Sequence, residues 1–113
     1  MKHIYIALPY THKEPHVRRY RYEQCLKYAL ELAAQGYGVI SPVLMAHDLY
    51  ELSLVTGVEI PYDFWVDVSD RAFKGADEVH LLKLEGWDKS TGVRKELDWA
   101  AENVIPVIDV EIS

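Results

Sequence analysis

The sequence predicts an α/β fold with three layers, of the flavodoxin or Rossmann type, in which about four to five parallel strands form a sheet flanked by helices. Three observations lead to this prediction. Short apolar runs alternate along the chain with longer amphipathic segments. The first three of these segments follow one another as strand, helix and strand within about forty residues, which is the βαβ unit of a parallel sheet. The 113 residues, half of them hydrophobic, suffice for one domain, and no linker or repeat divides residues 1–113.

The N-terminal half of the chain contains this βαβ unit. His3–Leu8 is a short apolar run that a proline ends, as is typical of a buried strand. Val17–Gln35 carries apolar side chains at spacings of three and four residues and stops before a glycine, which predicts an amphipathic helix on the sheet. Tyr37–Ser41 is a second apolar run before a proline, and we expect it to be the next strand.

The C-terminal half predicts further helices and two further strands. Residues 43–57 fit a short helix followed by a loop, because a glycine and a proline interrupt any longer element. Residues 62–75 place large apolar side chains on one side of a helix, and Asp77–Leu84 is expected to be a strand. Ser90–Asn103 is expected to form the last helix, capped by its own serine, and Ile105–Val110 the last strand.

The composition argues against several classes of partner. Asp and Glu outnumber Lys and Arg by 18 to 12, which gives a formal net charge of -6, so long nucleic acid is not expected to bind. No apolar run approaches the ~20 residues that cross a bilayer, and no leader precedes the first strand, so we expect a soluble protein without a membrane partner. The lone Cys25 cannot form an internal disulfide, which favours a reducing, cytoplasmic location.

The segment Gly86–Glu96 combines features that suit a ligand site. A helix N-terminus attracts anions through its free N–H groups and its dipole, and Ser90 adds a hydroxyl there. Gly92 lets a phosphate or a sugar approach the backbone closely. Glu96 lies beyond the first turn, where it can face the same cleft and remain ionised as a nucleophile. An ordinary capped helix with a solvated glutamate gives the same pattern, so the pattern alone leaves both interpretations open.

Four stretches, taken in order, resemble the nucleoside 2-deoxyribosyltransferase superfamily: residues 4–11, residues 38–42, residues 76–79, and Ser-x-Gly-x-x-x-Glu at residues 90–96. The superfamily includes nucleoside 5′-monophosphate N-glycosidases and a branch of small, often phage-encoded proteins. The resemblance covers nearly the whole chain. It implies an enzyme that cleaves the N-glycosidic bond of a nucleoside or nucleotide, by hydrolysis or by transfer of the sugar to an acceptor base.

The resemblance also implies roles for individual residues. Glu96 would attack the anomeric carbon to form a glycosyl-enzyme, and Tyr5, at the end of the first strand, would orient it. Ser90 would contact a 5′-phosphate or a 5′-hydroxyl. Asp70 would be the acid that protonates the leaving base.

Departures from the superfamily pattern keep alternatives open. An ungapped alignment puts Ser69 in the place of the family's acid, so Asp67 and Asp63 remain alternatives to Asp70. Leu8 stands where relatives commonly have glycine, and Asp98 replaces a small residue after the catalytic glutamate. These departures favour a second interpretation, in which the protein senses or sequesters a nucleotide without turning it over.

A basic cluster follows the first predicted strand in a chain that is otherwise acidic. It consists of Arg18, Arg19 and Arg21. A guanidinium pairs bidentately with phosphate oxygens, and we choose Arg19 as the candidate for that contact. A solvated helix face would explain the cluster equally well.

Other candidates for ligand contacts lie after the predicted strands, at the side of the sheet where ligands bind in this fold. Tyr10 and Thr11 follow the first strand, and His47 follows the second, where it contacts the base or is a surface residue. Trp87, beside a glycine in the loop after the third strand, is the preferred residue for stacking on a nucleobase, together with Tyr10. Trp65 fits the apolar side of its helix, and we expect it in the core.

The sequence predicts neither a metal nor a cofactor. His12 and His16 are four residues apart, but no cysteine or carboxylate cluster completes a set of ligands. The Gly-x-Gly-x-x-Gly pattern of dinucleotide-binding folds is absent from the sequence.

The resemblance implies a homo-oligomer, because relatives form dimers or larger assemblies whose sites borrow residues across the interface. The aromatic-rich stretch Tyr50–Trp65 is a candidate for such a surface. The expected partners are therefore a nucleoside or nucleotide and further copies of the same chain.

Overall fold

The computed structural model of the chain describes residues 1–112. Its sheet contains four parallel strands, β1 (His3–Ala7), β2 (Gly38–Ile40), β3 (Glu78–Leu82) and β4 (Val107–Val110). The strand order is β2-β1-β3-β4. This is the beginning of the flavodoxin order, in which the chain changes direction between β1 and β3. The predicted fold class is confirmed.

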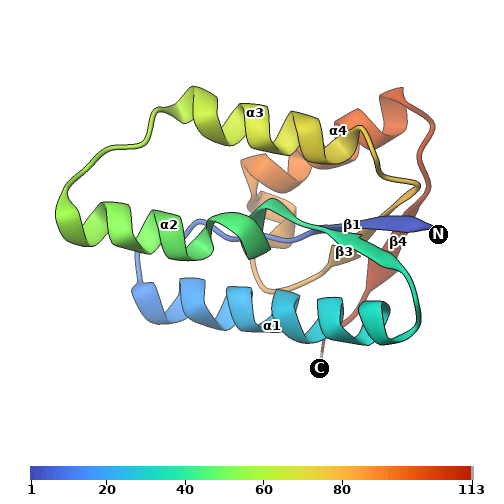
Figure 1. The fold of residues 1–113 in the computed structure, drawn as a ribbon, viewed down its shortest axis with the longest axis horizontal. Coiled ribbons are helices and arrows are strands. Elements are labelled where there is room, and N and C mark those ends of the chain that lie inside the picture. The colour runs from blue at the N-terminus through green and yellow to red at the C-terminus, as the bar shows by residue number, and fades with distance from the viewer. Residues whose placement is uncertain (113) are drawn as a thin grey trace.

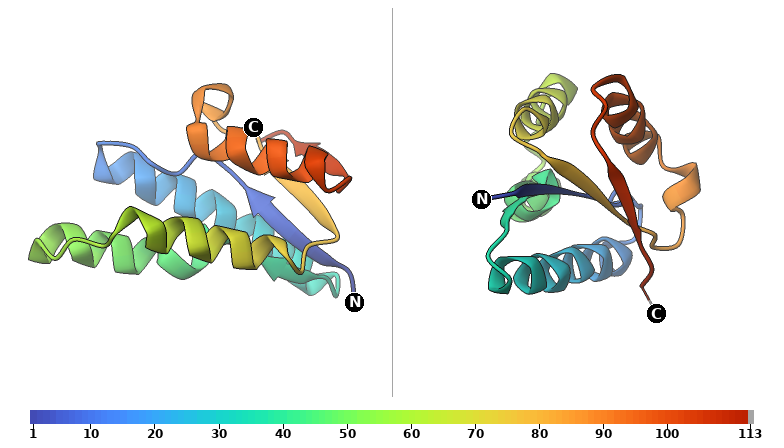
Figure 2. Two further views of the ribbon diagram at one scale, coloured as in Figure 1. Left: turned by 90° about the horizontal axis from the view of Figure 1, so that it is seen from above. Right: turned by 90° about the vertical axis from the view of Figure 1, so that its right-hand side faces the viewer.

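Helices cover both faces of this sheet (Figures 1 and 2). On one face α1 (Pro15–Ala34) packs on the strands, and α2 (Pro42–Thr56) lies beside it. On the other face lie α3 (Tyr62–Phe73) and α4 (Thr91–Glu102). The right-hand view in Figure 2 shows the sheet between α1 on one side and α3 and α4 on the other. A one-turn 3-10 helix, η1 (Trp87–Lys89), precedes α4 and was not predicted.

Side chains of β1 alternate between the two cores, as the period of two along a strand requires. Ile4, Ile6 and Leu8 belong to the cluster on the α1 face. Tyr5 and Ala7 belong to the cluster on the α3 and α4 face. The alternation therefore directs Tyr5 toward α4.

The prediction of a short helix and a loop for residues 43–57 is wrong, because α2 is a single helix of 15 residues. Pro42 is tolerated in its first turn, where its missing N–H has no helical partner. Gly57 ends the helix in the left-handed conformation, with a φ of 74°. The glycine was correctly seen as a breaker, but it acts at the end of the helix and not within it.

The predicted start of the first helix is wrong by two residues, whereas the predicted cap of the last helix is confirmed. The first helix begins at Pro15 and not at Val17, since a proline is also acceptable in its first turn. Ser90 caps α4 as predicted, because its Oγ accepts a hydrogen bond of 3.2 Å from the Val93 backbone N–H. No helix within residues 1–112 is both long enough and apolar enough to cross a membrane.

Candidate active site

An open cleft of about 950 Å³ lies at the carboxyl ends of β1 and β3. Its walls come from the loop after β1, from α2, from α3, and from α4 with the turn before it. This is the position at which a parallel sheet with a change of direction leaves a crevice. The cleft therefore lies on the side of the sheet where the sequence predicted a ligand.

Tyr5 and Glu96 meet in this cleft although 91 residues separate them. The Tyr5 hydroxyl donates a hydrogen bond to Glu96 Oε2. The Tyr5 ring is stacked on Phe73 at a centroid distance of 4.2 Å, and Phe73 is stacked in turn on Trp99 at 4.2 Å. Tyr5 lies in the middle of β1 and not at its end as predicted, and its long side chain nevertheless reaches the cleft. The stack holds the phenol that binds Glu96.

The protonation state of Glu96 differs from the prediction. Burial raises the pKa of the Glu96 carboxyl to about 8, and the hydrogen bond from Tyr5 lowers this pKa by a smaller amount. The pKa of the Tyr5 phenol is also raised, first by burial and then by the neighbouring Glu96. At neutral pH a carboxyl with this pKa is largely protonated and not ionised. Loss of water around the carboxylate outweighs the benefit of one hydrogen bond.

The N-terminus of α4 forms one side of the cleft. Ser90, Thr91 and Gly92 all line it. The Ser90 oxygen is occupied as the acceptor of the helix cap, so its O–H remains able to donate to a ligand. Ser90, the N-cap of α4, and Glu96, within α4, both line the cleft, which is one of the two interpretations that the sequence left open.

The three arginines of the basic cluster have three different environments, because successive residues of a helix point about 100° apart. Arg18 is buried and forms an ion pair with Glu51. Arg19 is exposed and lines a separate hollow of about 290 Å³. Arg21 lines the main cleft and donates hydrogen bonds of 3.0 Å to the carbonyls of Thr11 and Glu85. The choice of Arg19 as a cleft residue is corrected, and Arg21 takes its place.

Arg21 joins the two loops that follow β1 and β3. Burial lowers the pKa of its guanidinium, and the nearby Glu85 raises it by a smaller amount. Gly86 makes room for this side chain, because a Cβ at that position would lie 3.2 Å from an Arg21 nitrogen. Gly86 also has a φ of 91°, which favours glycine.

Aromatic residues form another side of the cleft, which we call the aromatic wall: Tyr10, His47, Tyr50 and Trp65. The Tyr10 hydroxyl is hydrogen-bonded to His47 Nδ1 at 2.6 Å. The Tyr10 ring meets the Tyr50 ring edge-on at a centroid distance of 6.0 Å, and Tyr50 meets Trp65 in the same way at 6.0 Å. Thr11 lines the cleft beside this wall.

The two tryptophans exchange the roles that the sequence suggested. Trp65 is half-buried and lines the cleft, so its prediction as a core residue is wrong. Trp87 does not line the cleft but packs on the core between the sheet, α3 and α4, with the Lys83 ammonium 4.9 Å from its ring centroid. The turn η1 directs Trp87 inward, and neither η1 nor this direction could be recognised from the sequence.

Of the predicted acids, Asp70 lines the cleft, near the end of α3. Asp67 is held on the surface by Arg71, at 2.9 Å. Asp63 does not line the cleft. Ser69, one residue before Asp70, also lines the cleft, and its hydroxyl lowers the pKa of the Tyr5 phenol by less than burial raises it. Asp98 adds another carboxyl group at the same cleft.

Sequence reasoning missed Tyr50 and Glu51 as parts of the site. His47, Tyr50 and Glu51 stand at helical spacings of three and four residues, so they share one face of α2. This spacing can be read from the sequence, but it indicates a shared face only if the helix extends to Glu51, and the predicted helix was too short.

The chain matches the family described as a domain of unknown function (DUF1937) over residues 2–112. A search of curated proteins finds no match. The family match extends over nearly all of the chain and includes every residue of the cleft. The chain therefore belongs to the DUF1937 family.

Proposed function

We propose that the protein cleaves the N-glycosidic bond of a nucleoside or nucleoside 5′-monophosphate, with Glu96 as the nucleophile. The observation that supports this proposal is the Glu96 carboxyl in the cleft, held by the Tyr5 hydroxyl through Oε2. This bond orients the group while Oε1 remains for attack. A carboxylate so placed stabilises the positive charge that develops at an anomeric carbon.

The reaction has two steps. A Glu96 oxygen forms a bond to the anomeric carbon while the bond from that carbon to the base nitrogen breaks, and Asp70 gives the leaving base a proton. Water or an acceptor base then attacks the same carbon, gives its proton to Asp70, and releases Glu96 as the bond from Glu96 to the sugar breaks. Glu96 gives its own proton to water as the first step begins, and the positive charge that develops on the sugar favours the ionised carboxylate, because opposite charge lowers the pKa of a carboxyl group.

The cleft offers different chemistry to the two ends of a nucleotide. The N-terminus of α4, the Ser90 hydroxyl and the remaining N–H donors of Arg21 suit a 5′-phosphate or 5′-hydroxyl. The aromatic wall suits the planar base, since stacking on an aromatic side chain contributes about 1–3 kcal/mol per base.

The test is to incubate the protein with a panel of nucleosides and 5′-monophosphates and to measure free base by chromatography. We expect release from at least one compound and a loss of at least about a thousandfold in Glu96→Gln, because the nucleophile is then missing. Glu23→Gln is the matched control, since Glu23 is exposed on α1. No release from any compound, or undiminished release by Glu96→Gln, would contradict the proposal.

A second candidate function is binding of a nucleotide without turnover. Leu8 lines the cleft at a position where the superfamily that the sequence resembles commonly has glycine, and Asp98 brings a further carboxyl to the cleft. A nucleotide that raises the melting temperature by mass action, with no base released, would favour this candidate.

We also propose that the protein forms a homo-oligomer. Met45, Leu49 and Leu52 stand at spacings of four and three residues on α2, and all are exposed. A stripe of apolar side chains on one side of a helix is a suitable contact for a second copy.

A further inference from the structure

We propose that Arg18 and Glu51 are positioning residues whose ion pair holds the aromatic wall in the arrangement that receives the planar base; this inference rests on the function proposed above. Neither residue lines the cleft, and both contact residues that do. They therefore act on a ligand only through other side chains.

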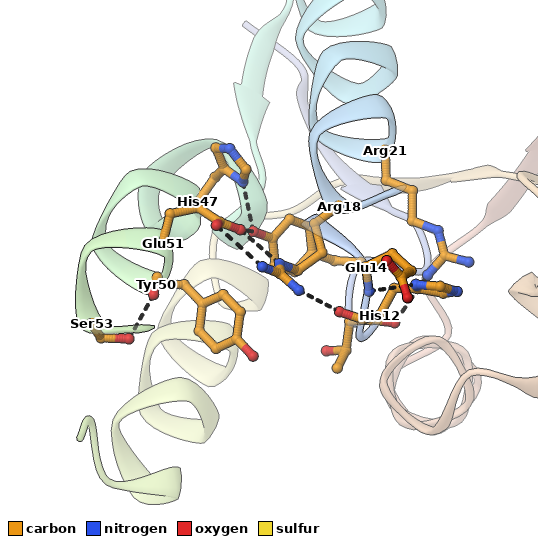
Figure 3. Close-up of polar contacts among 10 residues, drawn as sticks. His12, Glu14, Arg18, Arg21, His47, Tyr50, Glu51 and Ser53 are labelled. Atoms are coloured by element: carbon orange, nitrogen blue, oxygen red, sulfur yellow. Dashed lines mark hydrogen bonds and ion pairs between the residues drawn. The ribbon is translucent and has the colours of Figure 1, made fainter. Parts of the chain in front are cut away.

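One guanidinium joins two separate parts of the site (Figure 3). Arg18 Nε and Nη2 donate to the two carboxylate oxygens of Glu51, at 2.7 and 3.2 Å. Arg18 Nη1 donates to the His12 carbonyl at 2.6 Å. The ion pair thus fastens the loop after β1 to the middle of α2.

Two residues of the aromatic wall, Tyr10 and Tyr50, contact this ion pair directly. Glu51 Oε1 accepts a hydrogen bond of 3.5 Å from the Tyr10 hydroxyl, which also binds His47. The Arg18 guanidinium lies 5.5 Å from the centroid of the Tyr50 ring. His47 is fixed from its other side by Tyr22, which is stacked on it at 4.2 Å with an angle of 10°. Three of the four wall residues therefore depend on one buried ion pair or on a direct neighbour of it.

The chemistry of the pair suits positioning better than stabilisation. The Arg18 side chain is only 5% exposed and that of Glu51 29% exposed. A buried ion pair contributes little net stability compared with apolar packing, but removing one partner leaves an uncompensated charge that must move to water. The pair raises the pKa of Arg18 and lowers that of Glu51, so both remain charged at neutral pH. Loss of the Glu51 charge should release Arg18, the His12 carbonyl and with them Tyr10.

The decisive variant is Glu51→Gln, which keeps the size of the side chain and removes its charge. Glu78→Gln is its matched control, because Glu78 also accepts from two partners, Lys2 and His80, but lies at the opposite end of β3 from the cleft. Two ligands are compared by calorimetry: the 5′-monophosphate that binds the wild type most tightly, and ribose 5-phosphate, which has no base.

We expect Glu51→Gln to raise the Kd of the nucleotide about tenfold, in line with the loss of one good stacking contact. The Kd of ribose 5-phosphate should stay within about twofold, because the wall does not touch the sugar or the phosphate. Hydrogen exchange of residues 10–14 should become at least about tenfold faster in Glu51→Gln, while the strand amides keep their protection. Glu78→Gln should change none of these quantities.

A general loss of structure would weaken both ligands equally, and this result would overturn the proposal. Unchanged exchange of residues 10–14, or faster exchange with an unchanged nucleotide Kd, would overturn it as well. If Glu51→Gln does not fold, Tyr10→Phe replaces it, since this variant keeps the ion pair and cuts its link to His47; only the nucleotide Kd should then rise. Wild-type protein that binds no nucleotide would contradict the proposed function, and the exchange measurement alone would still decide whether the pair anchors the loop.

Discussion

The Glu96 carboxyl has to satisfy two opposing requirements. A nucleophile must be ionised, whereas burial raises the pKa of this carboxyl to about 8. Tyr5, which donates to Glu96, is itself buried and offers the only side-chain hydrogen bond to that carboxyl among residues 1–112. The site therefore keeps a group whose charged form is costly in the empty protein and is favoured when positive charge develops beside it.

At the same scale, this pKa predicts how stability depends on pH. The folded protein holds the Glu96 proton more tightly than the unfolded chain, whose carboxyl has a pKa near 4.5. Glu96 thus contributes stability below pH 4.5 that is lost as the pH rises toward 8. The loss is about 3 kcal/mol of unfolding free energy at pH 7, at about 1.4 kcal/mol per pKa unit. Glu96→Gln should not show this loss.

Urea denaturation of the wild type and of Glu96→Gln at pH 5 and pH 8 measures the effect. The unfolding free energy of Glu96→Gln, relative to that of the wild type, should increase from pH 5 to pH 8. That of the control Glu23→Gln should not. A difference between Glu96→Gln and the wild type that stays constant with pH would show that Glu96 is not buried in the folded protein.

At the scale of elements, the turn from β3 into η1 matters because it seats Arg21. Gly86 has a φ of 91°, and Gly36, which follows α1, has the same φ of 91°. The two differ in their surroundings, since a Cβ at Gly36 would meet no atom within 4 Å, whereas a Cβ at Gly86 would press on Arg21. The same substitution made at both glycines therefore distinguishes the effect of backbone strain from the effect of displacing Arg21.

Substitution of either glycine by alanine should cost about 1–2 kcal/mol of unfolding free energy, the usual penalty of a left-handed residue with a Cβ. Only Gly86→Ala should also weaken binding of a 5′-monophosphate relative to the corresponding nucleoside, because Arg21 is displaced. Thermal unfolding measures the change in stability, and calorimetry with the 5′-monophosphate and with the nucleoside measures the change in affinity. If both variants changed the nucleotide affinity equally, the proposal that Arg21 binds the 5′-phosphate would be contradicted.

At the scale of the whole molecule, the exposed apolar stripe on α2 predicts self-association. Light scattering coupled to gel filtration should give the wild type a multiple of the monomer mass. Replacing both Leu49 and Leu52 by lysine should give a folded monomer, because the charges cannot be buried in the contact. Leu30→Lys, at an exposed position of α1, is the control. A wild type that is monomeric at micromolar concentration would contradict this prediction.

The sequence by itself determined the order of strands and helices and the cap at Ser90. It also named Tyr5 and Glu96 as candidate site residues that act together. The first two depend on local features, namely apolar periodicity, breakers and a side chain that satisfies a nearby N–H. The third came from a family resemblance, and the structure joins the two side chains by a hydrogen bond.

Only the tertiary structure decided which side chains reach the cleft and in which charge state. It placed Trp65 at the cleft and Trp87 on the core, and it selected Arg21 from three adjacent arginines. It also buries Glu96, which raises the pKa of its carboxyl to about 8. These outcomes depend on the rotation of each helix against the sheet and on the water that packing removes. Both are set by contacts between residues far apart in the chain, so no local pattern encodes them.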